Sequence, residues 1–303
     1  MLTRVLLCCC LLAALPVWAD DPSVLLAALG DVMCARTVPA RVTAHGPAWV
    51  WEPLAPYLAR ADLRFCNLEC PATDGGRAIP KRYSFRADPA QMHAVLAAGK
   101  IDVVALANNH TFDYGRSGLA QTMATMRAAG ILAPGAGLGR AAAVAPRLLT
   151  VHGLTLAFLA YTSWTPEGYT PSEDGACLAT LDETTLAQEI RSAKAHADLV
   201  ILSVHWGKEY APVPTPYQRD VAHLAIESGA DLILGHHPHV TQPLEIYHDR
   251  PIFYSLGNAL FDRSDARYSN GLLALVRLTR GTVTVERQVP FRLEDARAVL
   301  LAP

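Results

Sequence analysis

The sequence lacks an excess of charge of either sign, which limits the partners it can bind. Its 303 residues include 26 lysines and arginines against 28 aspartates and glutamates, so the formal net charge is −2. No basic stripe of the kind found on nucleic-acid-binding surfaces runs along the chain. We therefore expect no nucleic-acid partner.

Long hydrophobic runs are scarce as well. Arg4 precedes an eleven-residue apolar run at 5–15, and Ala19 then precedes two aspartates. This order is typical of a secretory signal peptide that is cleaved after Ala19. The run is short for a membrane span, and no later run reaches that length. We expect residues 1–19 to be a leader and the protein to be periplasmic or at the cell surface, or membrane-anchored if the leader is retained.

Cysteines are few once such a leader is removed. Three of the seven lie at 8–10, which leaves Cys34, Cys66, Cys70 and Cys177. In an extended chain Cys66 and Cys70 would be roughly 13 Å apart, too far for a disulfide. An exported protein can form disulfides, so either Cys34 is bonded to Cys66 or Cys70, or all four are free buried thiols.

Internal repeats, low-complexity tracts and breaks in composition are also lacking, so residues 20–303 are predicted to form one domain. The composition, 51% hydrophobic and 18% charged, is ordinary for a globular α/β protein. Apolar runs predict strands at 24–29, 63–66, 103–107, 154–160, 199–204 and 232–234. Helical patterns lie at 89–98, 118–129, 181–196 and 216–228. This alternation predicts a layered α/β architecture.

The last third of the chain has a different pattern. Strands are predicted at 244–247, 252–255, 272–279 and 282–287, without helices between them, and Arg280 with Gly281 indicates a hairpin. A second tight turn is indicated at 151–154. Strands joined by helices and strands joined by hairpins together favour two mixed β-sheets packed face to face and flanked by helices.

The most informative segment contains three histidines within four residues, at 236, 237 and 239, directly after an apolar strand. A residue before proline is usually held extended, so His237 and His239 are predicted to project to one side and His236 elsewhere. Two neutral imidazoles placed in this way can share one metal ion. We favour a metal site here over a polar surface turn.

Other residue types suited to metal binding or catalysis follow the earlier strands. The carboxyl ends of strands meet at one edge of an α/β fold, so residues distant in sequence can converge there. Each residue alone has a structural explanation as a turn, surface or core residue, but their recurrence predicts one site. The residues are Asp31, Glu69, Asn109, His110 and His205.

Catalytic roles can be assigned to three residues within these segments. An imidazole such as His110, beside an amide that can bind a cation, can protonate a leaving oxygen. Asp113 either fixes the tautomer of His110 or caps the following helix. Glu209 either orients an imidazole or lies in solvent.

Taken together, these segments resemble the CapA family of capsule-synthesis proteins, also called poly-γ-glutamate biosynthesis proteins, a branch of the calcineurin-like metallophosphoesterases. The resemblance covers nearly all of 20–303. The motifs that carry it are GDVM at 30–33, NLE at 67–69, LANNHTFDYG at 106–115, HWGKEY at 205–210, GHHPHV at 235–240 and YSLGN at 254–258.

The resemblance implies a metallophosphoesterase-like α/β/β/α sandwich, with His110 as the general acid. Met33 stands where the wider pattern has a histidine ligand, and Glu69 stands where it has a bridging aspartate. One or two divalent ions are therefore expected, with manganese, iron and zinc all compatible with the donors. The implied ligands are Asp31, Glu69, Asn109, His205, His237 and His239.

A small basic group in the loop after Gly76 is a candidate substrate-binding surface. It comprises Lys81 and Arg82, with Arg86 nearby, and it is either a solvated loop or a site for an anionic polymer or phosphate ester. Three functions follow as hypotheses. The first is an exported metal-dependent hydrolase in cell-surface polymer synthesis. The second is a non-catalytic accessory protein that binds the polymer or a membrane-bound polymer synthetase and holds a structural metal, and the third is a general periplasmic metallophosphatase.

Overall fold

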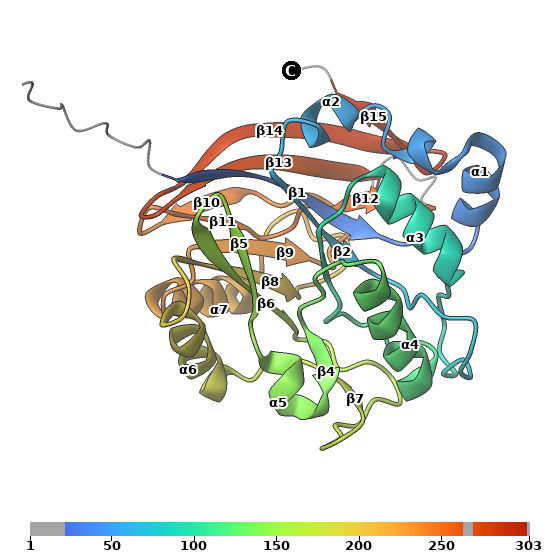
Figure 1. Cartoon of the computed structure of the whole chain (residues 1–303), viewed down its shortest axis with the longest axis horizontal. Coiled ribbons are helices and arrows are strands. Elements are labelled where there is room, and N and C mark those ends of the chain that lie inside the picture. Colours follow the sequence, from blue (N-terminus) through green and yellow to red (C-terminus); the bar gives the residue numbers. More distant parts are fainter. Residues whose placement is uncertain (1–21, 263–268, 302–303) are drawn as a thin grey trace, which may run out of the picture.

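The computed structural model describes residues 22–262 and 269–301, and two mixed β-sheets form its centre (Figure 1). The seven-stranded sheet has the order β15 (Arg297–Leu300), β14 (Val283–Glu294), β13 (Asn270–Thr279), β1 (Ser23–Val32), β2 (Leu63–Leu68) and β3 (Val103–Ala105), and β12 (Asn258–Leu260) pairs with the end of β1. The six-stranded sheet has the order β10 (Leu244–Tyr247), β11 (Arg250–Phe253), β9 (Leu232–His236), β8 (Leu199–His205), β6 (Leu154–Thr162) and β5 (Arg147–Val151). A separate pair joins β4 (Ala136–Leu138) to β7 (Ala176–Leu178).

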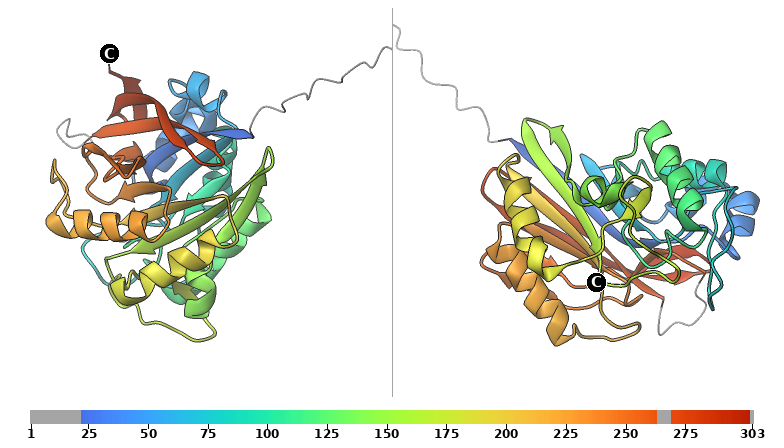
Figure 2. Two further views of the ribbon diagram at one scale, coloured as in Figure 1. Left: turned by 90° about the vertical axis from the view of Figure 1, so that its left-hand side faces the viewer. Right: turned by 90° about the horizontal axis from the view of Figure 1, so that it is seen from below.

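Helices lie outside the two sheets, as the two turned views in Figure 2 show. Helices α6 and α7 contact each other, and α6 packs on β6 and β8 of the six-stranded sheet. Helix α3 packs against the short 3-10 helix η1, which also contacts β15 of the other sheet. The bounds are α1 (Val38–His45), η1 (Pro47–Val50), α2 (Ala55–Leu58), α3 (Pro89–Ala98), α4 (Gly115–Ala128), α5 (Gly139–Val144), α6 (Glu183–Lys194) and α7 (Pro216–Glu227).

Local sequence signals explain where several elements begin and turn. Helix α3 starts after Asp88, whose side chain accepts a hydrogen bond from the backbone N–H of Gln91 at 2.8 Å. Helix α7 starts with a capping box formed by Thr215 and Gln218. The hairpin between β13 and β14 turns at residues 280–282, where Thr279 N donates to Thr282 O at 3.0 Å. These boundaries agree with the sequence analysis.

The predicted fold class is confirmed, although some elements were missed or misplaced. The sequence analysis missed α1, β12 and β15, and β14 continues seven residues beyond the predicted strand end at 287. Strand β1 also continues to Val32, so Asp31 lies inside a strand and not in the turn after it.

Apolar side chains join the two sheets. The ring of Phe65 on β2 lies 6.4 Å, centre to centre, from that of Phe158 on β6, and both are buried. Strands β1, β2 and β3 are parallel in one sheet, and β6, β8 and β9 are parallel in the other. The carboxyl ends of both parallel sets carry the polar residues identified from the sequence.

The predicted leader at 1–19 lies outside the described residues. Within 22–262 and 269–301, no helix combines the length and apolar character needed to cross a membrane.

The disulfide hypothesis for Cys34 is wrong, and the free-thiol alternative is confirmed. All four cysteines are free and buried, with the backbone N–H of Cys34 donating to the sulfur of Cys70 at 3.4 Å. Burial raises the pKa of the Cys34 thiol to about 12 and that of Cys70 well above its usual value. The thiols of Cys34 and Cys70 are therefore neutral, packed groups at ordinary pH.

We predict that alkylation of unfolded, unreduced protein labels Cys34, Cys66, Cys70 and Cys177, because no oxidised pair needs to be opened first. Peptide mass spectrometry measures the labelling. A cross-linked peptide that contains Cys34 and Cys70 would contradict the free-thiol structure.

Candidate metal centre

The strands and the segments that follow them bring six polar residues together, of which all but the half-buried Asn109 are buried. They are Asp31, Glu69, Asn109, His205, His237 and His239. Asp31 lies near the end of β1, Glu69 directly follows β2, and His205 ends β8. Gly30 makes this convergence possible, because a Cβ atom there would lie only 1.9 Å from the carbonyl oxygen of Gly257. The close approach lets β12 pair with β1, so that Asp31 lies opposite Asn258.

Three of these residues form a compact donor group, Asp31, Glu69 and His239. Each offers one ligand atom, and these atoms lie within 4.8 Å of one another. His239 Nε2 is 3.6 Å from Glu69 Oε1, and His239 Nδ1 is 3.5 Å from Asp31 Oδ2. Two carboxylates and an imidazole in this arrangement suit a divalent cation.

A second donor group surrounds the Nε2 atom of His205. Asn109 Oδ1 lies 2.9 Å from it, His237 Nδ1 lies 3.1 Å from it, and Glu69 Oε1 lies 3.9 Å from it. Metal–ligand bonds of about 2.1 Å place neighbouring ligand atoms roughly 3 Å apart, so Asn109 Oδ1 and His237 Nδ1 are spaced as ligands that share one ion with His205 Nε2, whereas Glu69 Oε1 lies farther away. Glu69 therefore stands between the two groups.

The state of Glu69 tests whether the residues fit a metal. Its side chain is fully buried, and neither carboxylate oxygen has a hydrogen-bond partner among the described residues. Burial, reinforced by the charge of Asp31, raises its pKa well above the usual value. A buried carboxylate without a partner is strongly unfavourable, and a cation between the two groups would satisfy it. The residues fit a divalent ion.

The imidazoles are in the right charge state to act as ligands. Burial lowers the pKa of His205 well below its usual value, and burial together with His239 lowers that of His237 to about 3. Both rings are therefore neutral at physiological pH, as metal ligation requires. For Asp31, burial pushes the pKa up, but His236 and His239 outweigh it and hold the pKa well below its usual value.

The backbone of the histidine segment differs from the prediction. His237 and His239 have φ angles of 96° and 57°, so neither is in the extended conformation expected from Pro238. The turn nevertheless brings both rings to the site, 6.0 Å apart, and the N–H of His237 contacts Asp31 Oδ2 at 3.3 Å. Backbone strain of this kind is common where a fold holds functional groups.

As expected from the sequence, His236 does not project with His237 and His239, but it contacts Asp31 from the interior side. Its Nδ1 lies 3.2 Å from Asp31 Oδ1. The sequence analysis gave no role to Asn67, which donates to Asp31 Oδ1 at 2.9 Å, or to Asn258, whose Oδ1 lies 2.9 Å from His239 Nδ1. Asn67 lies in the motif NLE and Asn258 in the motif YSLGN, so these motifs were the sequence signal that could have indicated a role at the site.

Met33 does not restore the missing imidazole. Its side chain is fully buried, and its sulfur accepts a hydrogen bond from the backbone N–H of Ala35 at 3.1 Å. A thioether is a poor ligand for the ions that carboxylates and amides prefer. The group of Asp31, Glu69 and His239 thus has three strong protein donors.

His110 and Asp113 form a buried pair beside the donor groups. His110 Nδ1 is 2.8 Å from Asp113 Oδ2, and the His110 ring stacks on Phe85 with centres 4.1 Å apart. Asp113 does not cap α4, whose N-cap residue is Tyr114 and has no side-chain cap bond. Of the two roles considered for Asp113, orientation of the imidazole agrees with the structure.

Lys81 is not part of an exposed basic loop, which corrects its predicted role in substrate binding. Its side chain is 6% exposed, and its ammonium lies 2.5 Å from Asp113 Oδ1 and 2.9 Å from the carbonyl oxygen of Asn109. Lys81 therefore holds the segment that carries Asn109, His110 and Asp113 in place.

Arg82 and Glu209 lie at the opening of the site. They line a pocket of about 380 Å³ whose wall also includes His110 and His239. Glu209 is exposed and lines this pocket, which agrees with the alternative that it lies in solvent. Arg82 packs its guanidinium on the ring of Tyr83 at 5.1 Å and is exposed to incoming anions.

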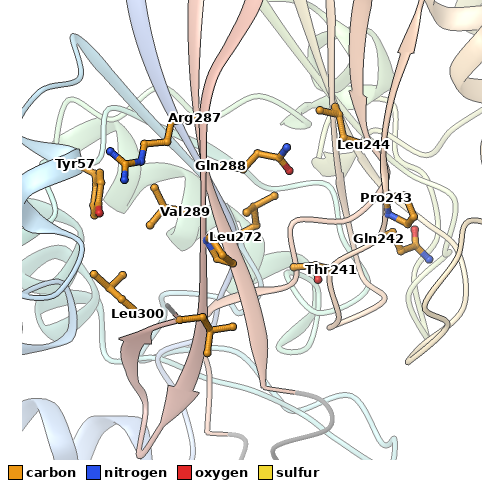
Figure 3. A pocket seen from close by; sticks show the side chains of 12 residues that line it. Tyr57, Thr241, Gln242, Pro243, Leu244, Leu272, Arg287, Gln288, Val289 and Leu300 are labelled. Carbon is orange, nitrogen blue, oxygen red and sulfur yellow. The ribbon is translucent and has the colours of Figure 1, made fainter. Parts of the chain in front are cut away.

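A larger cavity of about 830 Å³ lies elsewhere, along β14. Figure 3 shows Leu272 and Val289 at its centre, Tyr57 and Leu300 on one side, and Leu244 on the other. Its lining contains no histidine, cysteine or carboxylate and shares no residue with the pocket at His110. The candidate catalytic residue His110 and the candidate ligand His239 line the smaller pocket.

The chain matches a known protein family and individual relatives over most of its length. The family model described as bacterial capsule synthesis protein PGA_cap matches residues 25–263. The chain belongs to this family. The capsule biosynthesis protein CapA of Bacillus anthracis is 30% identical over 91% of this chain and 69% of its own length. The PGA biosynthesis protein CapA of Bacillus subtilis is 30% identical over 88% of this chain and 71% of its own length.

Among solved structures, the NAD nucleotidase of Haemophilus influenzae superposes with a TM-score of 0.56 and 13% sequence identity. The match covers 93% of this chain and 60% of the nucleotidase, so this PGA_cap-family chain spans less than two thirds of that protein. At this identity the likeness concerns the fold alone. It agrees with the predicted α/β fold of two sheets packed face to face and flanked by helices.

We predict that Lys81→Met lowers the free energy of unfolding by about 3 kcal/mol, because it leaves the buried Asp113 carboxylate without its counter-charge. Arg82→Ala is the matched control from the same loop and should change stability by less than about 0.5 kcal/mol. Urea unfolding measures both. Equal effects of the two substitutions would contradict the buried ion pair.

We also predict that metal binding releases a proton from Glu69. Its raised pKa means that the metal-free side chain keeps its proton at a pH where an ordinary glutamate has lost it, and a cation must displace that proton. Affinity should therefore rise with pH until the pH passes the pKa of Glu69. Titration calorimetry in buffers of different ionisation enthalpy measures the release, and an affinity unchanged between pH 5 and pH 8 would contradict it.

Proposed function

We propose that this PGA_cap-family protein is an exported, metal-dependent hydrolase of the phosphoesterase type that acts in the synthesis or release of an anionic cell-surface polymer such as poly-γ-glutamate. One observation carries the chemical part. His110, which is paired with Asp113, lines the same pocket as His239, a member of the compact donor group. The names of the two Bacillus relatives support the biological part.

The donor groups would hold one or two divalent ions, with manganese, iron and zinc each compatible with carboxylate, amide and imidazole ligands. Bound there, such an ion supplies Lewis-acid polarisation of a phosphoryl oxygen and activates water. The ligands would be Asp31, Glu69, Asn109, His205, His237 and His239.

The proton for the leaving group would come from His110. Because Nδ1 faces Asp113, Nε2 remains available to hold and deliver a proton. Burial lowers the pKa of His110, and the Asp113 carboxylate opposes that effect by stabilising the imidazolium. The net effect is a lowered pKa, so the imidazolium form of His110 gives up its Nε2 proton more readily than an exposed histidine does, while Asp113 limits this effect.

Recognition of an anionic substrate would fall to Arg82 at the rim. Its guanidinium faces solvent beside Tyr83, and no acidic side chain is paired with it among the described residues. Lys81, in contrast, is already occupied by Asp113 and Asn109. An anionic polymer or a phosphate ester could bind at this rim, and a membrane-bound polymer synthetase would be the natural partner of the whole protein.

A second function is favoured by Met33. With three strong donors in the compact group, the metal could be structural, and the protein would then be a non-catalytic accessory that binds the polymer or its synthetase. Elemental analysis combined with phosphomonoester, phosphodiester and γ-glutamyl substrates separates the two functions. Bound metal without turnover of any substrate would favour the accessory function. Turnover of simple phosphate esters alone would indicate a general periplasmic metallophosphatase.

We predict that His110→Ala lowers turnover by about 10² to 10⁴-fold, because it removes the proton donor, while metal content stays close to that of the unsubstituted protein. His205→Ala is the comparison variant and should lose both metal and activity. Steady-state kinetics and elemental analysis measure the two effects. Normal turnover in His110→Ala would refute its role as the acid.

A further inference from the structure

His236 is a buried imidazole that the metal ligands and the acid do not account for. It ends β9, is 0% exposed, and packs against the ring of Phe65 at 5.9 Å. Its Nδ1 lies 3.2 Å from Asp31 Oδ1, yet neither ring nitrogen makes an aligned hydrogen bond with any described residue. Leaving both nitrogens of a buried imidazole unpaired is unfavourable, so this placement calls for a function.

The surroundings of Asp31 indicate what that function is. Its Oδ1 atom faces the interior, where Asn67 Nδ2 donates to it at 2.9 Å and His236 Nδ1 approaches. Its Oδ2 atom faces the donor group, 3.5 Å from His239 Nδ1. One oxygen of Asp31 thus faces Asn67 and His236, while the other faces the compact donor group.

We infer that His236 is a positioning residue for metal binding, which donates from Nδ1 to Asp31 Oδ1 and so turns Asp31 Oδ2 toward the ion. This inference rests on the proposed metal centre. A small rotation of the imidazole or of the Asp31 carboxylate aligns the two atoms, which are already within bonding distance. Groups that hydrogen-bond to a metal ligand fix its orientation and strengthen its binding.

The shortage of donors makes this positioning important. Met33 contributes no imidazole, so Asp31 is one of only three strong donors in the compact group. With fewer ligands, each must be better oriented, because an ion loses a larger share of its binding energy when one ligand turns away. His236 compensates for the lost donor without becoming a ligand itself.

The test compares two substitutions at position 236. His236→Phe keeps a ring against Phe65 but removes the donor, whereas His236→Asn keeps an N–H donor close to the position of Nδ1. The affinity of the whole protein for Mn²⁺ and Zn²⁺ is measured by competition with a chelator. We expect about 10 to 100-fold weaker binding in His236→Phe and recovery to within a few-fold in His236→Asn.

A matched control separates positioning from packing. Phe65→Leu disturbs the ring contact but leaves the His236 donor in place, so it should lower the melting temperature of the metal-free protein without weakening metal binding. Equal losses of affinity in Phe65→Leu and His236→Phe would overturn the inference, as would unchanged affinity in His236→Phe. Absence of metal binding in the unsubstituted protein would instead overturn the metal centre and, with it, this role of His236.

Discussion

The buried carboxylate of Glu69 is the constraint on which the rest of the site depends. It has no hydrogen-bond partner among the described residues, and it lies 3.6 Å from His239 on one side and 3.9 Å from His205 on the other. A core tolerates such a group only as a protonated acid or as the ligand of a cation. The lowered pKa of His205 leaves its imidazole able to offer a lone pair to a cation but unable to neutralise a carboxylate. The carboxyl group of Glu69 is therefore satisfied either by a proton or by a bound cation.

The framework that holds Glu69 is rigid because the surrounding contacts allow little adjustment. Gly30 passes so close to Gly257 that any side chain would collide with the backbone, and Gly235 is similarly confined against Tyr254. These contacts hold β1 against β12 and β9 against the segment after β11. Ligands carried by such strands are placed more reproducibly than ligands on free loops, which is what a site with few donors needs.

The two donor groups differ in what supports them. The group around His205 includes an amide and two imidazoles, while the compact group has Met33 in place of a further imidazole and relies on Asp31 being well oriented. The fold shared with a nucleotidase does not decide which chemistry results, because function depends on the site and not on the architecture. His110, at the end of the buried Lys81–Asp113–His110 chain, nevertheless lines the same pocket as the donor His239, an arrangement that a purely structural metal would not require.

The sequence by itself determined the fold class, the family and most of the residues that meet at the centre. Apolar periodicity marks the strands, and the carboxyl ends of parallel strands meet at one edge in any α/β fold, so Asp31, Glu69 and His205 could be placed together without coordinates. Only the tertiary structure decided the roles of side chains whose partners are remote in sequence. Lys81 proved to be a buried counter-ion rather than a surface cation, and His236 proved to face Asp31, because burial and pairing depend on contacts between distant segments that no local pattern encodes.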